Sequence, residues 1–178
     1  MLLTKKRRTV GRSFRIDENL LNVLNEEAEK QGVSVNSLLN RLLQRYSYLR
    51  FMLRYGAITL TRKGFVGILE CCPDDMIKER GVTAGSTIAK DILLTMGAPT
   101  DLGFVADLIE KLLSEFAGWF ECDHHVKRDK EILHLRHDLG KKWSLYLTGA
   151  AQGICKSVLK KDVDVEMTDS SVTMTINK

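Results

Sequence analysis

Residues 13–43 have the sequence SFRIDENLLNVLNEEAEKQGVSVNSLLNRLL, which determines the fold expected for the N-terminal part of the chain. Polar and apolar side chains alternate over residues 13–16, and this period of two predicts a short strand with one buried face. Asp17 is placed to cap a helix that runs to about Lys30. The apolar side of that helix consists of Leu20, Leu21, Leu24 and Ala28.

A second helix is predicted after a glycine turn. Gly32 lies just beyond the first helix, where a residue without a Cβ adopts the left-handed conformation most easily. Ser34 can cap the next helix, whose apolar stripe consists of Leu38, Leu39, Leu42, Leu43 and Tyr46. One short strand and two short helices bury too little apolar surface to be stable alone. We therefore expect the unit to pair with a second copy through an antiparallel ribbon and four packed helices.

Positive charge is concentrated in the same part of the chain. The whole sequence has a net charge of +4, but residues 1–55 alone carry +6 and the remainder carries −2. The first sixteen residues contain six cations and no acid. This distribution is typical of a segment that contacts a polyanion, although a solvated basic tail without a partner has the same composition.

The strand SFRID, the helix ENLLNVLNEEAEKQG and the Gly-x-Ser turn of GVSVNSLLNRLL resemble the ribbon-helix-helix family of DNA-binding repressors, over residues 9–48. The resemblance implies that Ser13 and Arg15 contact base edges in the major groove. It also implies phosphate contacts for the basic arm and for the start of the second helix, which are Lys5, Lys6, Arg7, Arg8, Arg12, Ser34, Val35, Asn36 and Ser37. A solvent-exposed strand face is the alternative for Ser13 and Arg15.

The rest of the chain predicts an α+β domain. Apolar residues around the turn signal Arg62-Lys63-Gly64 predict a strand or hairpin over residues 58–69. Helices are predicted over residues 73–96, either continuous or broken at Gly81, over 101–117 and over 139–159. Strands are predicted over residues 119–126, 131–137, 163–167 and 172–176. This order resembles the split β-α-β sandwich of many ligand-sensing modules.

We expect three parts in all. Residues 1–48 form the ribbon-helix-helix unit with its basic arm, residues 49–56 extend its second helix or act as a linker, and residues 57–178 form a sensor or oligomerisation domain. Nickel-responsive members of the ribbon-helix-helix family have a similar layout. The histidine and cysteine spacings here differ from their ligand set, so the resemblance does not imply nickel.

A symmetric turn at residues 127–130 predicts the register of the central hairpin. It pairs Cys122 with Leu135 on the buried face and Glu121 with Arg136 on the other face.

The cysteines and histidines allow two interpretations. Cys122, His124 and His137 share a face and are candidate ligands of a transition metal, with a further ligand from elsewhere. The alternative is a buried thiol beside a row of polar pairs. The adjacent Cys71 and Cys72 do not make a disulfide framework, and either could respond to oxidants if its thiolate is exposed. No other cofactor is expected.

Several functional classes are not expected. No apolar run reaches the ~18 residues that a membrane span needs, and the start of the chain lacks the apolar core of a secretion signal. We therefore expect a cytoplasmic protein without membrane contact. No nucleophile motif, phosphate loop or carboxylate pair stands out, so we do not expect an enzyme.

The expected function is that of a sequence-specific transcription regulator, such as a repressor, that binds double-stranded DNA as a homodimer or higher homo-oligomer. Its C-terminal domain would assemble subunits or sense an effector that the sequence does not identify. Two alternatives remain: an antitoxin of a toxin-antitoxin pair, and a metal- or small-molecule-binding protein that uses its N-terminal unit only to dimerise.

Overall fold

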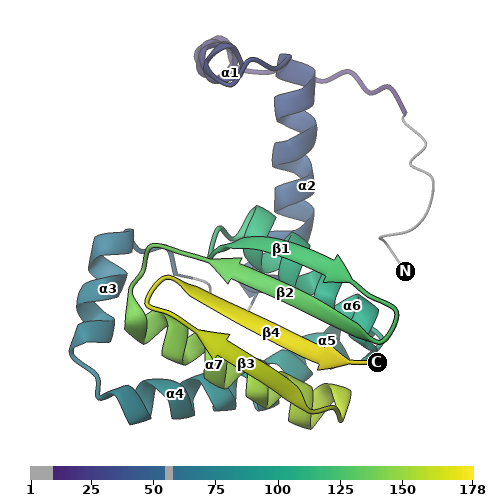
Figure 1. Cartoon of the computed structure of the whole chain (residues 1–178). Helices are drawn as coiled ribbons and strands as arrows, with labels where there is room; N and C mark the ends of the chain where they lie inside the picture. The colour runs from purple at the N-terminus through teal and green to yellow at the C-terminus, as the bar shows by residue number, and fades with distance from the viewer. Residues whose placement is uncertain (1–9, 55–57) are drawn as a thin grey trace. The chain divides into compact units, whose positions relative to one another are not determined.

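The computed structural model describes residues 10–54 and 58–178 (Figure 1). The chain divides into two compact units, Met1–Gly56 and Ala57–Lys178. Each unit has a hydrophobic cluster of its own.

The first unit contains two helices, as predicted. Helix α1 is Glu18–Lys30, and the Asp17 carboxylate caps it by accepting hydrogen bonds from the amides of Asn19 and Leu20 at 3.0 and 3.3 Å. Gly32 follows with a φ of 63°, the left-handed conformation that ends the helix. Helix α2 is Val35–Arg54, so residues 49–54 continue the helix.

The strand predicted over residues 13–16 is absent, and that prediction is wrong. Residues 10–17 have no regular secondary structure, and most of their side chains are exposed. A strand is held by hydrogen bonds to a neighbouring strand. Residues 10–54, as described, contain no other strand with which this segment could pair.

The second unit contains a four-stranded antiparallel sheet in the order β1-β2-β4-β3. The strands are β1 (Glu121–Val126), β2 (Lys130–Arg136), β3 (Val163–Met167) and β4 (Ser171–Asn177). Strand β4 pairs antiparallel with both β2 and β3, so those two strands run parallel to each other with β4 inserted between them. The predicted hairpin register is confirmed, because Cys122 pairs with Leu135 and Glu121 with Arg136.

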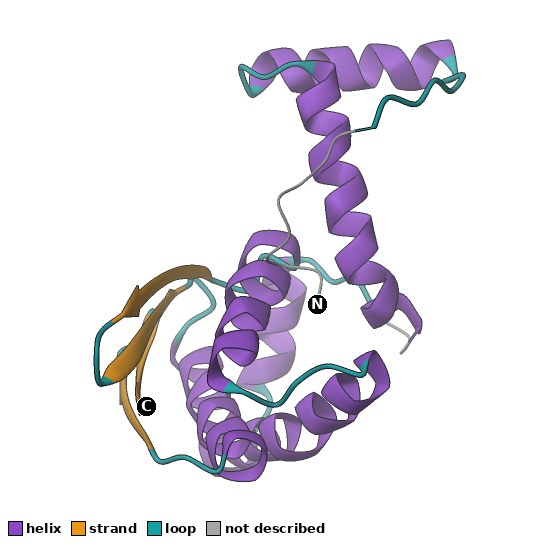
Figure 2. Cartoon of the chain, turned by 90° about the vertical axis from the view of Figure 1, so that its right-hand side faces the viewer, coloured by secondary structure: helices purple, strands orange, loops and turns teal. Residues whose placement is uncertain are grey.

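Helices cover one face of this sheet (Figure 2). The elements are α3 (Arg62–Glu70), α4 (Asp74–Thr83), η1 (Ala84–Ile88), α5 (Ala89–Met96), α6 (Leu102–Leu108), η2 (Ile109–Phe116), α7 (Lys141–Ile154) and η3 (Cys155–Leu159), where η marks a π-helical segment. The core between helices and sheet includes Leu93, Val105, Leu133, Cys155, Val172 and Ile176. The expected α+β class is therefore confirmed for this unit. None of the helices in the described residues is long and apolar enough to cross a membrane.

Helix α3 replaces the strand or hairpin predicted over residues 58–69, and that prediction is wrong. The hydroxyl of Thr61 accepts a hydrogen bond from the Gly64 amide at 3.2 Å and caps the helix. Phe65 and Leu69, four residues apart, then lie on one helical face. Leu69 is buried, and the ring of Phe65 meets Trp143 edge-on at 5.2 Å between centroids.

Helices α4 and α7 approach each other very closely. Of the two alternatives for residues 73–96, a break at Gly81 does not occur, because α4 runs through it. Gly81 and Gly85 face α7, and Gly149 and Gly153 face α4, at positions where an added Cβ would lie 2.1–2.4 Å from a backbone oxygen of the other helix. The two helices can therefore lie this close together because these four positions are glycines, which have no side chain.

Candidate functional site

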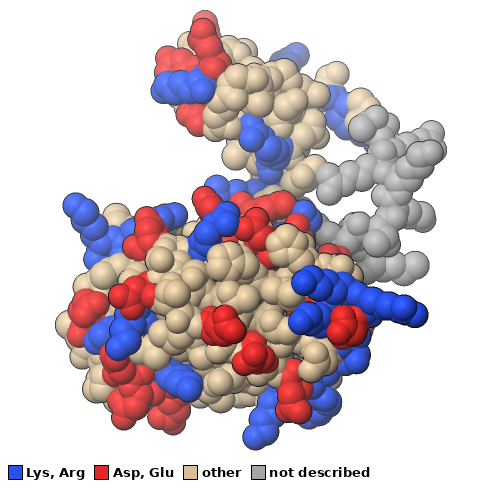
Figure 3. Space-filling model, viewed as in Figure 1, with Lys and Arg blue, Asp and Glu red and all other residues tan. Residues whose placement is uncertain are grey.

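The first candidate site is an apolar surface on α1 and α2. Among the described side chains of residues 10–54, only Leu24, Ala28 and Leu38 are buried. Large apolar side chains that remain exposed are Val10, Phe14, Leu20, Leu21, Val23, Leu42, Leu43 and Tyr46. Uncharged atoms make up much of the visible surface of the unit (Figure 3). An apolar surface of this extent on a small unit indicates contact with another protein.

Helix α1 leaves the Leu42, Leu43 and Tyr46 side chains of α2 uncovered, because it crosses α2 near the start of that helix (Figure 2). Helix α1 has 13 residues and α2 has 20. The buried cluster includes Val33, Val35 and Leu39 at its edge, so α1 packs against the turn and the start of α2. Further along the same stripe, Leu42, Leu43 and Tyr46 are 43%, 59% and 63% exposed.

The two helices of this unit carry opposite charge. Helix α2 contains four arginines and no acid, whereas α1 contains four glutamates and one lysine. The ion pairs of the described residues all lie in the second unit. Arg41 donates a hydrogen bond to the side chain of Gln31 at 2.8 Å and so connects α2 to the end of α1. The charge of α2 is therefore not neutralised within the described unit.

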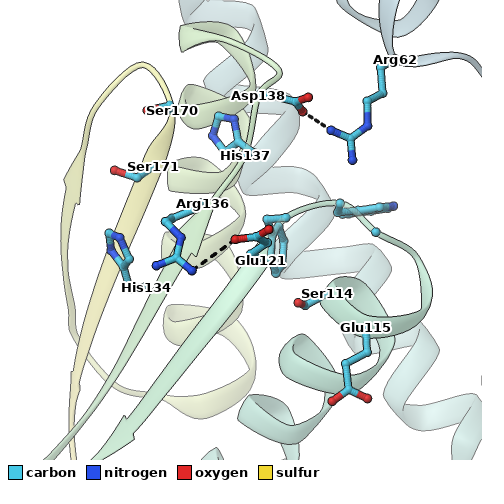
Figure 4. A pocket seen from close by; sticks show the side chains of 13 residues that line it. Arg62, Ser114, Glu115, Glu121, His134, Arg136, His137, Asp138, Ser170 and Ser171 are labelled. Atoms are coloured by element: carbon cyan, nitrogen blue, oxygen red, sulfur yellow. Dashed lines mark hydrogen bonds and ion pairs between the residues drawn. The ribbon is translucent and has the colours of Figure 1, made fainter. Parts of the chain in front are cut away.

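The second candidate site is an open pocket of about 780 Å³ at one end of the sheet (Figure 4). Its walls come from the start of α3, the end of η2, the segment that leads into β1, the end of β2 and the turn between β3 and β4. The lining residues are Arg62, Ser114, Glu115, Gly118, Trp119, Phe120, Glu121, His134, Arg136, His137, Asp138, Ser170 and Ser171. Its volume lies in the range of small-molecule sites.

The cations of this pocket are already paired. Arg62 forms an ion pair with Asp138, and Arg136 contacts Glu121 at 3.2 Å and Asp123 at 2.6 Å. These pairs raise the pKa of each guanidinium and so leave both charges in place. Acidic and basic side chains are also interspersed over the visible sheet face (Figure 3). The pocket therefore presents no excess of one charge to a ligand.

His137 and Ser144 lie together beside the pocket, but their geometry is not that of a base and a nucleophile. The Leu139 amide donates to Nδ1 of His137 at 3.3 Å, so Nδ1 carries no proton. In the neutral ring the proton is then on Nε2, which donates to the Ser144 hydroxyl at 3.0 Å. Burial lowers the pKa of His137, which favours this neutral form. A base that activates serine would need a free lone pair on Nε2.

The predicted metal ligands are not brought together. The ring nitrogens of His124 lie 3.1 Å from Glu131 and 3.6 Å from Glu110, and those of His137 contact Ser144 and the Leu139 amide. Burial raises the pKa of Cys122 to about 11, so its thiol stays protonated. Within the described ranges, no three His, Cys, Asp or Glu side chains could hold a metal ion together.

The residues that the family resemblance placed on DNA are dispersed. Lys5, Lys6, Arg7 and Arg8 lie outside the described residues. Arg12, Ser13 and Arg15 are exposed in the irregular segment before α1. Ser34 instead accepts a hydrogen bond from the Ser37 amide at 3.2 Å at the start of α2, and Val35 and Asn36 lie in the first turn of that helix.

Comparisons with known proteins give one structural similarity. No family model matches the sequence, and no curated protein is similar to it. A solved structure similar to this chain is a trafficking protein particle complex subunit 3 from Naegleria fowleri, covalently bound to palmitic acid. The two chains are 11% identical, the match covers 79% of this chain and 96% of the other, and the TM-score is 0.43.

These findings correct the expected function. The strand that would enter the DNA groove is not formed in the described residues. The ribbon-helix-helix regulator, its binding to double-stranded DNA and the ribbon dimer are therefore withdrawn. The two alternatives, an antitoxin and a metal- or small-molecule-binding protein that dimerises through its N-terminal unit, relied on the same ribbon and are withdrawn with it.

Sequence reasoning missed the exposed surface of Leu42, Leu43 and Tyr46 on α2. The apolar stripe is visible in the sequence as far as Tyr46, but the part of it that α1 covers depends on where the two helices cross. The pocket gave no signal, because its lining residues come from five segments that only the folded chain brings together.

Proposed function

We propose that this chain is a subunit of a protein assembly and that its helical unit, residues 10–54, contacts another protein. The observation that carries the proposal is the exposed apolar stripe of Leu42, Leu43 and Tyr46 on α2. Complete burial of an apolar side chain contributes about 1.5–3 kcal/mol, so covering these half-exposed groups would contribute about 3 kcal/mol to binding.

We further propose that the chain is not an enzyme. His137 carries its proton on Nε2, the nitrogen that faces Ser144, so it cannot accept the proton of that hydroxyl. Ser144 is also completely buried. A fluorophosphonate probe should therefore leave Ser144 unlabelled in the folded chain, and labelling that requires His137 would contradict the proposal.

The assembly role is tested by purifying the tagged full chain with its bound protein and then reconstituting the complex from the two purified components. The double substitution Leu43→Ser with Tyr46→Ser should weaken the reconstituted complex about 30-fold, which corresponds to about 2 kcal/mol. Both side chains are exposed, so the buried cluster of the unit is unchanged.

The matched control replaces two equally exposed apolar residues of the second unit, Ile88→Ser with Leu94→Ser. These changes should leave the affinity within about twofold of the wild type. The proposal is wrong if the chain forms no stoichiometric complex, or if the complex is as tight with the α2 variant as with the control variant.

A further inference from the structure

The exposed part of α2 forms one continuous stripe. At about 100° per residue, Leu38, Leu42, Tyr46, Leu39 and Leu43 span about 140° of the helix surface. Helix α1 covers the end with Leu38 and Leu39, and the remaining three side chains are free. The three free side chains are spaced i, i+1 and i+4, so they form one turn of the apolar face that a second amphipathic helix recognises.

Positive charge borders this stripe. Leu38 marks one edge of the apolar stripe, and Arg45 and Arg41 lie about 20° and 60° beyond that edge around the helix axis. Arg50 lies one turn beyond Tyr46, with its Nε donating to the Ser47 carbonyl at 3.2 Å. Arg45 is exposed and has no hydrogen-bond or ion-pair partner in the described part of the chain. A partner helix would therefore meet apolar side chains in the centre and cations along one edge.

A second copy of this chain matches that surface poorly. When two α2 helices pair antiparallel about a twofold axis, the same edge of the stripe faces itself, so Arg41 and Arg45 would lie opposite like charges. Helix α1 of a second copy also presents no continuous exposed apolar stripe on which α2 could pack. Its exposed Leu20 and Val23 lie on one side of its buried face and its exposed Leu21 lies on the other side.

We infer that the surface formed by Leu42, Leu43 and Tyr46 on α2 binds an amphipathic helix of a different protein, in which glutamate or aspartate side chains line the edge of the apolar stripe that meets Arg45 and Arg41. This inference rests on the proposed assembly function and specifies the chemistry of the partner at the same surface. The apolar contacts hold the complex, and the acidic flanks select the partner by pairing with Arg45 and Arg41.

The test uses the full chain and two synthetic 21-residue peptides. Both peptides carry leucine at the a and d positions of three heptads, and they differ only in having glutamate or lysine at the e and g positions. Fluorescence anisotropy should show that the glutamate peptide binds at least about tenfold more tightly at low salt. This preference should shrink at about 0.5 M salt, where exposed charges are screened.

Three variants locate the binding surface. Arg45→Glu should remove or reverse the preference for the glutamate peptide, whereas Arg45→Lys should keep the affinity within about threefold. The double substitution Leu43→Ser with Tyr46→Ser should abolish binding of both peptides. Unchanged circular dichroism confirms that each variant is folded.

Several outcomes would overturn the inference. Equal binding of the two peptides, or a preference that survives Arg45→Glu, excludes acidic recognition at this surface. Sedimentation that shows the chain dimerising through Leu43 and Tyr46 assigns the surface to a second copy. If neither peptide binds but the reconstituted complex still depends on Leu43 and Tyr46, the partner chemistry is wrong and the assembly function stands.

Discussion

The substitution Gly85→Ala should destabilise the second unit by about 4 kcal/mol, because it drives a side chain into the backbone of α7. A Cβ at this position would lie 2.1 Å from the carbonyl oxygen of Ala150 and 2.8 Å from the amide nitrogen of Ile154. Ordinary contacts of a Cβ begin at 3.4 Å. The obstructing atoms are backbone, so no rotation of a side chain can relieve the contact.

The magnitude follows from what must move. The two helices would have to separate by about 1 Å, and a gap of that size forfeits a quarter to a half of the dispersion energy of the atoms around it. Overpacking of a core costs about 1–3 kcal/mol when side chains can adjust, and more when they cannot. Helix α7 also carries the buried Trp143, Leu147 and Ile154, whose contacts would loosen at the same time. We therefore expect about 3–5 kcal/mol, a large part of the stability of a unit of about 120 residues.

The assay is urea unfolding of the full chain followed by tryptophan fluorescence. The only tryptophans, Trp119 and Trp143, lie in the second unit, so the signal reports on that unit alone. Gly67→Ala is the matched control, because a Cβ at Gly67 meets nothing within 4 Å and lies inside α3. Alanine there should stabilise by about 0.5–1 kcal/mol through its higher helix propensity. The reasoning is refuted if Gly85→Ala unfolds at the urea concentration of the wild type or above it.

Two further predictions concern titratable side chains. Iodoacetamide should modify the exposed Cys71 first. Burial raises the pKa values of Cys122 and Cys155 to about 11, so these two thiols should react much more slowly until the chain unfolds. Mass spectrometry measures the three rates, and equal rates would contradict this prediction. Burial lowers the pKa of His137, so below about pH 6.5 the unfolded chain binds the proton more readily and stability falls as the pH falls. His137→Gln should lose this part of the pH dependence between pH 7.5 and 5.5 in urea unfolding, and a variant with the wild-type dependence would contradict the assignment.

The hairpin of β1 and β2 could be predicted in detail because two independent signals agree. The polar turn at residues 127–130 fixes the pairing, and the period of two then fixes which side chains are buried. Leu133 and Leu135 are buried as expected, and Arg136 contacts Glu121 across the strands. Period and turn are local properties, so the sequence contains them completely.

The segment around α3 was predicted wrongly because its apolar residues fit two periods. Ile58, Leu60, Phe65 and Leu69 allow a hairpin as well as a helix, and the contact of Phe65 with Trp143, nearly eighty residues away, favours the helix. The cap formed by Thr61 is a local signal that could have decided the question.

The close approach of α4 and α7 has a sequence signal whose partner could not be known. Gly81 and Gly85 are four residues apart, as are Gly149 and Gly153, and this spacing lines small residues along one face of a helix. A single glycine in a helix predicts a break. A matching pair on a second helix predicts close packing instead, but only the fold shows that the two faces meet.

The candidate site on α2 could also be predicted only in part. The charge of the helix and the length of its apolar stripe are properties of the sequence, whereas the extent to which α1 covers that stripe depends on packing. The segment at residues 13–16 shows the converse, because its alternation is compatible with a strand but the strand requires a partner.

The two units therefore differ in what stabilises them. The second unit is held by a core of its own, in which the helices close over one sheet face. Among its described residues, the first unit buries three side chains and leaves an apolar stripe with arginines at its edge exposed. A ligand that binds this stripe binds the folded helices and stabilises them by mass action. Binding is then linked to the folding of α1 and α2. A substitution that lowers the stability of either helix also lowers the affinity for the ligand, even when the contact residues are unchanged. Loss of the Asp17 cap, which costs about 1 kcal/mol and lies outside the stripe, would reduce binding through this linkage alone.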